Sequence, residues 1–416
     1  MRVTIRPSCA HGVITAPPSK SMAHRLLICA GLSEGESVVR GLSYSRDVEA
    51  TIACLRALGA EIRLEGDTAY VRGVDVTQPT GKRAILPCNE SGSTLRFFIP
   101  LCWLSGDERM LTGSEYLMTR PLSIYEQIAA EQNIRFEKFA DRVIVKGKPE
   151  NAVLAPIPGD VSSQFISGLL FALPLMRGRR ELYVKPPVES MPYIEMTCQT
   201  LREFGISAEQ FFDRESSRFV WRVPGREAYT PSDVTVEGDY SNAAFLEALN
   251  FTGSQVRVTG LKEDSAQGDR IYKILYKKIN DADGSPLTEP IDITDCPDLG
   301  PVLFAVAALC GGGRFIGTRR LKLKESDRAA AMREELSKLG ITVEVGENTV
   351  TVRPGTLRAP TQPLCGHNDH RIVMAMSVLL TKVGGSIDGA EAAAKSYPDF
   401  FERLTDLGVD LTYGMD

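Results

Sequence analysis

The sequence predicts a mixed α/β fold built from repeated units, and three recurring patterns support this prediction. In the first pattern, a helix ends at a small or polar residue and is followed by a short β-like run, a turn and a second strand. Copies recur roughly every 60 to 75 residues, a period typical of one supersecondary unit used repeatedly. The six copies centre on Gly59, Asn133, Gly205, Asn280, Gly340 and Gly408. The fourth copy is the least regular.

Glycines and turn residues justify the helix ends and the hairpins of this unit. A glycine directly after a helix adopts the left-handed conformation without a steric penalty, and short polar pairs between two β-like runs favour hairpin turns. The glycines expected to follow helices are Gly59, Gly205, Gly340 and Gly408. The expected turns are Gly66-Asp67, Ala140-Asp141 and Gly346-Glu347.

The second pattern is an apolar helix with a polar start, and residues 17–32 are its first example. Two prolines end the preceding segment, and Ser19, Lys20 and Ser21 then introduce a run that is apolar enough to be buried. The free N–H groups and positive dipole end of such a helix favour an anion, with Ser21 and Arg25 on one face beside it. The alternative is an ordinary serine-capped helix with two exposed cations.

Similar apolar helices are expected to begin near residues 91, 161, 239, 295 and 368. The third pattern is a charged loop that leads into an amphipathic helix, and it begins near residues 41, 113, 186, 260, 317 and 389. If the six units are equivalent in space, all these polar ends point toward one cleft. Polar ends of rigid elements commonly carry function.

The segment 223–233 is rich in turn residues and separates three copies of the repeat from the other three. The opening helix precedes the first copy, so residues 1–17 are expected to join the C-terminal half. The predicted domains are therefore a lobe of residues 18–233 and a lobe of residues 1–17 plus 234–416. Each lobe holds three repeat units, and the active site is expected in the cleft between them.

Composition narrows the class of protein. Hydrophobic residues make up 43% of the chain and charged residues 24%, as in ordinary globular proteins. Apolar runs are too short to span a membrane or to form a signal peptide, so a cytoplasmic protein without a membrane partner is expected. The net charge of −5 argues against nucleic acid as a partner. Nine scattered cysteines without a Cys-x-x-Cys pair suggest neither disulfides nor a zinc site.

Superposing the repeats gathers basic residues at corresponding positions, where they would concentrate field on an anionic small molecule. Guanidinium groups suit bidentate contacts with phosphate or carboxylate, whereas lysines act as movable point charges. A solvated surface cation is the alternative for each residue taken alone. The basic set is Lys20, Arg25, Arg96, Arg120, Lys324, Arg328, Arg371 and Lys395.

A polar trio and two carboxylates complete the candidate chemistry. Ser162, Ser163 and Gln164 would bind substrate oxygens, although a capped helix start explains them equally well. Asp298 follows a proline at a helix start, and nearby Asp295 would raise the pKa of either carboxyl group.

Glu325 lies among cations that favour its ionised form, or it simply pairs with Arg328. His370 is a proton donor or a hydrogen-bonded scaffold. The spacing of histidines and carboxylates suggests no metal site, and no nucleotide-binding glycine loop is present, so no cofactor is expected.

Ten motifs in order along the chain resemble the enolpyruvyl transferase family, within it the EPSP synthase branch. They are PPSKSMAHR (17–25), ESGSTLRF (90–97), LTGSEYLMTRP (111–121), GDVSSQF (159–165), ESMPYI (189–194), EGDYSNAAF (237–245), PDLGP (297–301), LKLKESDR (321–328), NDHRIVMA (368–375) and AKSYPDFF (394–401). The resemblance implies two pseudo-symmetric lobes, each of three βαβαββ units with buried parallel helices, an inside-out α/β barrel. A monomer that binds two small-molecule substrates is expected.

The resemblance implies transfer of the enolpyruvyl group of phosphoenolpyruvate to the 5-hydroxyl of shikimate 3-phosphate, with Asp298 as base, Glu325 as acid and Lys20 touching both substrates. Residues implied to bind shikimate 3-phosphate are Lys20, Ser21, Arg25, Ser162, Ser163, Gln164, Ser190, Tyr193, Asp298 and Lys324. Residues implied to bind phosphoenolpyruvate are Lys20, Gly92, Arg120, Gln164, Arg328, Arg371 and Lys395.

Two positions depart from the family pattern, and two other functions stay open. Glu90 stands where many relatives carry Asn, and Arg320 stands where some relatives carry Asn. A carboxylate at residue 90 would repel phosphoenolpyruvate unless it turns toward a cation. The first alternative function is enolpyruvyl transfer to a UDP-sugar, against which the Ser162–Gln164 trio and the KESDR run argue. The second is a phosphate-ligand sensor, which would keep the cations but not require Asp298 and Glu325.

Overall fold

The computed structural model describes residues 1–149, 154–178, 180–223, 228–281 and 289–414. The chain divides into two compact units, Pro18–Glu237 and a second unit made of Met1–Pro17 with Gly238–Asp416. The predicted boundary after Asp233 lies four residues too early. Strand β14 (Asp233–Thr235) pairs in parallel with β3 (Glu36–Arg40), and this pairing keeps residues 233–235 in the first unit.

The unit Pro18–Glu237 contains seven α-helices among its described residues. They are α1 (Lys20–Leu32), α2 (Arg46–Leu58), α3 (Gly92–Cys102), α4 (Glu115–Thr119), α5 (Ser123–Glu131), α6 (Ser163–Ala172) and α7 (Met191–Glu203), with the 3₁₀ helix η1 (Leu173–Leu175). Its strands besides β3 and β14 are β4 (Glu61–Glu65), β5 (Thr68–Arg72), β6 (Ala84–Asn89), β7 (Arg109–Gly113), β8 (Arg135–Lys138), β9 (Arg142–Lys146), β10 (Ile157–Pro158), β11 (Glu181–Lys185), β12 (Glu209–Asp213) and β13 (Arg218–Arg222).

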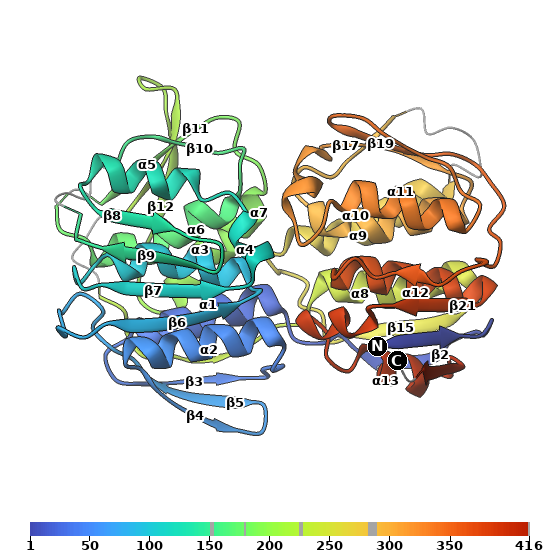
Figure 1. The fold of residues 1–416 in the computed structure, drawn as a ribbon, viewed down its shortest axis with the longest axis horizontal. Helices are drawn as coiled ribbons and strands as arrows, with labels where there is room; N and C mark the ends of the chain where they lie inside the picture. The colour runs from blue at the N-terminus through green and yellow to red at the C-terminus, as the bar shows by residue number, and fades with distance from the viewer. Residues whose placement is uncertain (150–153, 179, 224–227, 282–288, 415–416) are drawn as a thin grey trace. The chain divides into compact units, whose positions relative to one another are not determined.

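These strands form three four-stranded sheets with the same internal plan (Figure 1). The orders are β14-β3-β5-β4, β6-β7-β9-β8 and β10-β11-β13-β12. In each sheet the first pair is parallel and the remaining pairs are antiparallel. A parallel pair needs a crossover connection, and the βαβαββ repeat supplies a helix for it. In the first sheet, the strand parallel to β3 is β14, which comes from the C-terminal end of this unit.

The second unit contains the helices α8 (Tyr240–Ala248), α9 (Tyr272–Asp281), α10 (Gly300–Leu309), α11 (Arg328–Lys338), α12 (His370–Val383) and α13 (Phe400–Asp406). Its 3₁₀ helices are η2 (Leu249–Thr252), η3 (Gly268–Ile271), η4 (Pro297–Leu299), η5 (Arg319–Leu323) and η6 (Ala390–Lys395). Its strands are β1 (Arg2–Ile5), β2 (His11–Thr15), β15 (Gln255–Thr259), β16 (Ile291–Asp292), β17 (Gly313–Ile316), β18 (Val343–Val345), β19 (Thr349–Val352), β20 (Leu364–Cys365), β21 (Gly385–Asp388) and β22 (Leu411–Gly414).

The N-terminal strands complete two sheets of this second unit. Strand β1 lies between β21 and β22 in the sheet β20-β21-β1-β22, and β2 pairs in parallel with β15. The third sheet, β16-β17-β19-β18, follows the same plan as those of the first unit. The repeat centred on Asn280 contributes β15 to the two-stranded sheet β15-β2, and its segment after α9, residues 282–288, lies outside the described residues.

The predicted helix ends and hairpins are confirmed. Left-handed backbone angles occur at Gly59, Gly205, Gly340 and Gly408, and also at Asn133. The predicted turns join β4 to β5, β8 to β9 and β18 to β19 in antiparallel pairs. The mixed α/β class is confirmed, but the strands form separate sheets, so no closed barrel of hydrogen-bonded strands exists among the described residues.

Apolar helices form the core within each unit. In α3 and α6 almost every residue is buried, and in α10 nine of the ten residues are buried. A helix that is apolar on all sides must be covered on all sides, which surrounding sheets and helices provide here. None of the helices in the described part of the chain combines the length and apolar composition needed to cross a bilayer.

Candidate functional site

The start of α1 carries the first candidate group of the unit Pro18–Glu237. The Ser19 side chain caps the helix by accepting a hydrogen bond from the Met22 amide. Lys20 is the first helical residue, and its Nζ lies 2.9 Å from the Asp47 Oδ2 at the start of α2. Both side chains are largely buried, so this cation has a fixed counter-ion within its own unit.

Arg25 connects α1 to α7. Its Nε donates to the Thr197 hydroxyl at 2.8 Å, its Nη1 to the Ser21 carbonyl at 2.7 Å, and its Nη2 to the Tyr193 carbonyl at 2.9 Å. The guanidinium group also lies over the Phe97 ring. Burial lowers the pKa of Arg25 to about 10. The structure therefore gives this predicted binding residue a clear structural role as well.

Gln164 is held by residues of α3. Arg96 Nη1 donates to the Gln164 Oε1 at 2.5 Å, and the Gln164 Nε2 donates to the Ser93 hydroxyl at 3.0 Å. Arg96 in turn donates to the Pro121 carbonyl. These contacts fix the orientation of the amide, which identifies Arg96 as the residue that positions Gln164.

Arg120 lies against the first turn of α3. It follows α4 and is buried, and the lack of a side chain at Gly92 leaves room for its guanidinium group. A Cβ atom at residue 92 would collide with Arg120 Nη1. The Gly92–Arg120 packing therefore places a cation beside free backbone N–H groups, an arrangement that favours an anion.

Ser162, Ser163, Ser190 and Tyr193 lie at the starts of two neighbouring helices. Ser162 caps α6 through the Gln164 amide, and Ser163 is its first residue. Ser190 has a left-handed backbone before α7, and its carbonyl accepts from the Tyr193 amide. A hydrogen bond between the Thr197 and Ser167 hydroxyls joins α7 to α6.

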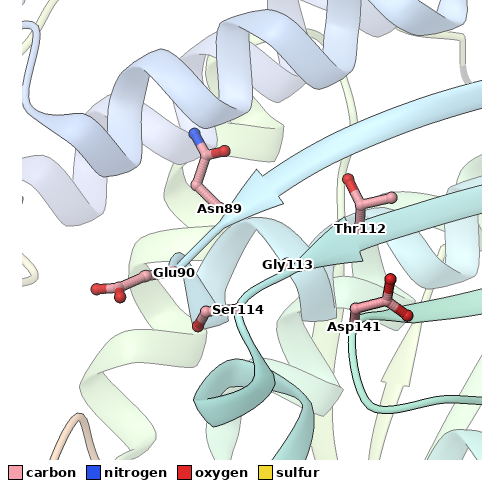
Figure 2. A pocket seen from close by; sticks show the side chains of 6 residues that line it. All are labelled: Asn89, Glu90, Thr112, Gly113, Ser114 and Asp141. Carbon is pink, nitrogen blue, oxygen red and sulfur yellow. The ribbon is translucent and has the colours of Figure 1, made fainter.

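An open cavity of about 360 Å³ lies near the end of β6 (Figure 2). It is lined by Asn89, Glu90, Thr112, Gly113, Ser114 and Asp141. Its charged lining residues are the carboxylates Glu90 and Asp141, which would repel a phosphorylated ligand. This cavity is therefore poorly suited to an anionic ligand.

Arg328 organises the candidate site of the second unit. It is the first residue of α11 and is 1% exposed. Its Nη1 donates to the Asp298 Oδ1 at 2.8 Å, its Nη2 to the Glu325 Oε2 at 2.6 Å, and its Nε to the Asp369 Oδ2 at 2.8 Å. Burial opposes the charge, but these three carboxylates raise the pKa of Arg328 well above its usual value.

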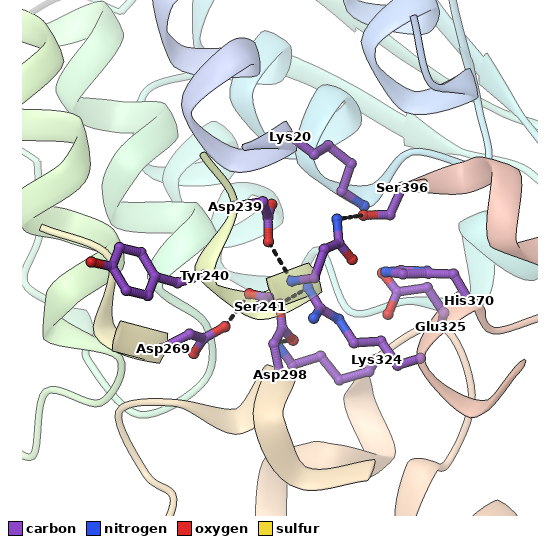
Figure 3. Close-up of polar contacts among 12 residues, drawn as sticks. Lys20, Asp239, Tyr240, Ser241, Asp269, Asp298, Lys324, Glu325, His370 and Ser396 are labelled. Carbon is purple, nitrogen blue, oxygen red and sulfur yellow. Dashed lines mark hydrogen bonds and ion pairs between the residues drawn. The ribbon is translucent and has the colours of Figure 1, made fainter. Parts of the chain in front are cut away.

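Asp298 also contacts two further cations. Lys324 Nζ lies 3.1 Å from its Oδ1 (Figure 3). Arg371 Nη2 donates to its Oδ2 at 3.3 Å. Burial would raise the pKa of Asp298, yet Lys324, Arg371 and Arg328 hold it well below the usual carboxyl value. The expectation that Asp295 raises the pKa of Asp298 is therefore wrong, because three cations in direct contact with Asp298 lower it. Burial lowers the pKa of Lys324 despite its contact with Asp298.

Lys395 contacts the loop that precedes α12, and His370 directly follows this loop. Lys395 is buried at the end of η6, and its Nζ donates to the Asn368 carbonyl at 2.7 Å. His370 is buried as the first residue of α12, with its Nδ1 3.8 Å from the Asp369 Oδ1. Asp369 caps this helix through the Arg371 amide and also accepts from the Ser326 hydroxyl.

A second group of polar side chains, which sequence reasoning missed, is buried close enough to Asp298 to interact with it electrostatically. Asp269 accepts a hydrogen bond from the Ser241 hydroxyl, and Asp239 caps α8 (Figure 3). Burial, together with repulsion from Asp298, raises the pKa of Asp269 to about 7. The sequence pattern had marked Asp239 only as a helix start, and Asp269 only as part of the charged loop that begins near residue 260.

Two residues that depart from the family pattern have defined positions. Glu90 lines the open cavity described above. Arg320 is buried in η5, and its Nη2 donates to the Thr294 carbonyl at 2.7 Å. A candidate metal-binding group that the sequence did not suggest is Glu334, Glu335 and His367, whose ligand atoms lie within 4.8 Å of one another.

Comparison with known proteins decides the family. The sequence model of EPSP synthase (3-phosphoshikimate 1-carboxyvinyltransferase) matches residues 6–404. The chain belongs to the EPSP synthase family. It is 35% identical to the 3-phosphoshikimate 1-carboxyvinyltransferase of Clostridium kluyveri, with 98% of both chains covered. It is 34% identical to the protein of the same name from Clostridium perfringens, again over 98% of both chains.

Solved structures share the fold of this member of the EPSP synthase family. The EPSP synthase of Acinetobacter baumannii has a TM-score of 0.73 at 21% identity, covering 99% of this chain and 100% of that chain. The enolpyruvyl transferase NikO of Streptomyces tendae has a TM-score of 0.75 at 17% identity, covering 100% of this chain and 99% of that chain. The predicted family and the predicted fold class are both confirmed.

Proposed function

We propose that this chain transfers the enolpyruvyl group of phosphoenolpyruvate to the 5-hydroxyl of shikimate 3-phosphate and releases phosphate. The family match over residues 6–404 and the names of the relatives support this reaction. The structural observation that carries the proposal is the contact of Asp298 and Glu325 with the same guanidinium group, that of Arg328. One cation therefore holds both the proposed base and the proposed acid.

The reaction needs one group that donates a proton to phosphoenolpyruvate and a second group that accepts the proton of the 5-hydroxyl. A proton from Glu325 adds to C3 of phosphoenolpyruvate, and C2 becomes cationic. Asp298 removes the proton of the 5-hydroxyl, whose oxygen bonds to C2. Loss of the C3 proton and of phosphate from the resulting tetrahedral adduct leaves the enol ether. Each general acid or base step typically contributes about 10²- to 10⁴-fold to the rate.

The ion pairs around Asp298 suggest how ligand binding prepares these groups. Three cations hold the pKa of Asp298 well below the usual value, which makes it a weak base in the ligand-free protein. A bound phosphate or carboxylate would compete for Arg328, Arg371 and Lys324. As these cations turn toward the ligand, the pKa of Asp298 rises, and the same competition frees Glu325 from Arg328. Substrate anions would thereby activate both carboxyl groups.

The remaining predicted residues are assigned to binding. The proposed shikimate 3-phosphate ligands are Lys20, Ser21, Arg25, Ser162, Ser163, Gln164, Ser190, Tyr193 and Lys324, and the proposed phosphoenolpyruvate ligands are Lys20, Gly92, Arg120, Gln164, Arg328, Arg371 and Lys395. Four helix starts in the unit Pro18–Glu237 and a buried cation cluster in the other unit support this assignment. The proposal requires both units to act on the same pair of substrates.

A phosphate-release assay tests the reaction. Purified protein is mixed with phosphoenolpyruvate and either shikimate 3-phosphate, a UDP-N-acetylhexosamine or no acceptor. We expect phosphate release with shikimate 3-phosphate only, together with an acid-labile enol ether product. Release with the UDP-sugar alone would support the sister reaction. Tight shikimate 3-phosphate binding without turnover would support the ligand-sensor alternative.

A further inference from the structure

The loop between β20 and α12 has an unusual backbone. His367 and Asn368 are consecutive non-glycine residues with positive φ angles of 49° and 50°. This left-handed conformation is unfavourable for residues with a Cβ atom, and it persists only where neighbouring groups hold it. The loop leads directly into Asp369 and the start of α12, so the interactions that hold the loop also position these residues.

Glu335 supplies these interactions from α11. It is 0% exposed, and its Oε2 accepts from the Cys365 amide at 2.9 Å. Its Oε1 lies 2.8 Å from the His367 Nε2. Lys338 Nζ donates to both carboxylate oxygens, at 2.8 and 3.0 Å. One buried carboxylate thus fixes Cys365, which precedes the left-handed pair, and His367, the first residue of that pair.

The other side of the same loop contacts the candidate active-site residues. The Asn368 carbonyl accepts from Lys395 Nζ at 2.7 Å. Asp369 accepts from Arg328 Nε at 2.8 Å and from the Ser326 hydroxyl at 3.0 Å. Glu335 and Arg328 belong to the same helix, α11. Glu335 of α11 therefore fixes the first part of the loop. The last part of the loop in turn binds Lys395 and Arg328.

We propose that Glu335 and His367 form a latch that positions Lys395 and Arg328 for phosphoenolpyruvate, although neither residue touches substrate. The inference rests on the proposed function for its kinetic consequences. Its structural part, the control of the loop by the Glu335–His367 pair, does not depend on that function.

The same cluster has the composition of a metal site, but a cation already occupies it. Glu334, Glu335 and His367 bring three ligand atoms within 4.8 Å of one another. The Lys338 ammonium lies 2.8 Å from Glu335 and 3.3 Å from Glu334. A metal ion would have to displace this ammonium. We therefore assign the cluster to the latch.

The latch is sensitive to pH. The hydrogen bond to Glu335 raises the pKa of His367, although burial opposes this shift. The charged groups that face the ring are Glu335, Glu334 and Lys338, and the Cys365 Sγ accepts from the His367 amide. Because the pKa is raised, the ion pair is complete at lower pH. It loses its charge as pH rises through the pKa of His367.

Nuclear magnetic resonance can observe the latch directly, without substrates, because the chain has only four histidines. Ring C–H resonances are followed against pH and assigned with His367→Gln. We expect His367 to titrate above the ordinary histidine pKa and Glu335→Gln to lower its titration midpoint. Equal midpoints for His367 in the wild-type protein and Glu335→Gln would overturn the latch, whatever the protein catalyses. Adding Zn²⁺ must leave the wild-type titration unchanged, since displacement of the proton by the metal would favour a metal site.

Steady-state kinetics tests the positioning role. A glutamine at residue 367 preserves a neutral donor, whereas His367→Ala removes it. We expect His367→Ala to raise the KM for phosphoenolpyruvate about 5- to 10-fold with kcat and the KM for shikimate 3-phosphate within about twofold. His367→Gln should match the wild-type enzyme above the pKa of His367 and show a higher KM below it.

The control variant is Glu344→Gln, which removes an exposed ion pair with Arg353 in the same unit and should change neither KM. Thermal melts identify any variant that fails to fold. An unchanged phosphoenolpyruvate KM in folded His367→Ala would overturn the positioning role. A complete lack of turnover in the wild-type protein would instead refute the proposed function, and the histidine titration would still test the latch.

Discussion

Arg328 contacts three carboxylates, and this geometry explains why charge alone did not reveal how the site is arranged. The basic residues gathered from the repeats predicted a positively charged surface that binds an anion. In the structure Arg328, Lys324 and Arg371 are paired with Asp298, and Arg328 is paired with Glu325 and Asp369 as well. Buried charges need partners, so these cations have them before any ligand arrives.

The two proposed catalytic carboxyl groups lead to the first prediction. Asp298→Asn and Glu325→Gln keep the size of each side chain and an oxygen that accepts from Arg328. We expect each substitution to lower kcat by about 10²- to 10⁴-fold, because one proton transfer is lost. Calorimetric binding of shikimate 3-phosphate should change little. Wild-type turnover in both variants would remove the assigned roles.

Gly92 leads to a second prediction, based on space. A methyl group at this position would meet the Arg120 guanidinium and displace it. We expect Gly92→Ala to raise the KM for phosphoenolpyruvate by about 10-fold or more, since small displacements of a positioning group have large kinetic effects.

A double-mutant cycle provides the control for Gly92. If the methyl group acts through Arg120, Gly92→Ala adds little to the defect of Arg120→Ala. Additive effects would show that residue 92 acts on the ligand in another way.

Asp269 leads to a third prediction, on pH and stability. Its pKa rises from 3.8 in the unfolded chain to about 7 in the folded protein, because of burial and the nearby Asp298. The folded state therefore holds a proton that the unfolded state releases between these values. The free energy of unfolding should therefore fall as pH rises through this window. The Asp269→Asn variant has no carboxyl group at this position, so it should not show the decrease that ionisation of Asp269 causes. The difference in free energy of unfolding between the variant and the wild-type protein should therefore shift by a few kcal/mol in favour of the variant as pH rises from below 3.8 to 8, at ~1.4 kcal/mol per pKa unit.

Denaturant unfolding at several pH values measures the effect at Asp269. Asp264→Asn, at an exposed position, serves as the matched control and should follow the wild-type pH dependence. A parallel pH dependence of Asp269→Asn and the wild-type protein would contradict the prediction.

At the scale of single elements, helix ends were predictable because their signals are local. Ser91 and Asp239 cap the helices that the sequence placed after them, through hydrogen bonds to amides three residues ahead. The helix expected near residue 295 instead begins as η4 at Pro297 and continues as α10 from Gly300. The helix expected at residue 368 is capped by Asp369, because Asn368 is held in a left-handed conformation by the loop.

The C-terminal glycines of the helices give a fourth prediction. Gly408 has a φ of 90° and open space around it, since a Cβ atom there would have its nearest neighbour 4.0 Å away. Gly205 has a φ of 80°, but a Cβ atom there would lie 2.6 Å from the Thr230 hydroxyl. Gly408→Ala should cost about 1 kcal/mol of unfolding free energy from backbone conformation alone, and Gly205→Ala should cost more. Equal losses in denaturant unfolding would show that the Thr230 contact adjusts freely.

At the scale of the whole molecule, the path of the chain determines which fragments can fold. The N-terminal strands belong to the C-terminal unit, where β1 lies between two strands of its sheet and β2 pairs with β15. Strand β14 belongs to the other unit. Each unit therefore takes part of its sheet structure from a distant part of the sequence.

A fifth prediction follows for separated fragments. Residues 18–237 should unfold cooperatively on their own, whereas residues 18–232, which lack β14, should be less stable. Residues 238–416 should fold only when residues 1–17 are supplied, because without β1 the strands β21 and β22 lose their shared partner. Circular dichroism and thermal melts of the four samples measure this. Independent cooperative folding of residues 238–416 would contradict the assigned role of β1.

The repeat, the helix ends, the hairpins and the family were all predictable from the order of the amino acids. These features depend on neighbours a few residues apart or on motifs that stay in order along the chain. Which charged side chains contact one another became known from the folded structure. Arg328 finds Asp298 and Asp369 at separations of 30 and 41 residues, and Glu335 finds His367 at a separation of 32. Periodicity carries no information on such pairs, because the packing of helices and loops within the folded unit brings them together.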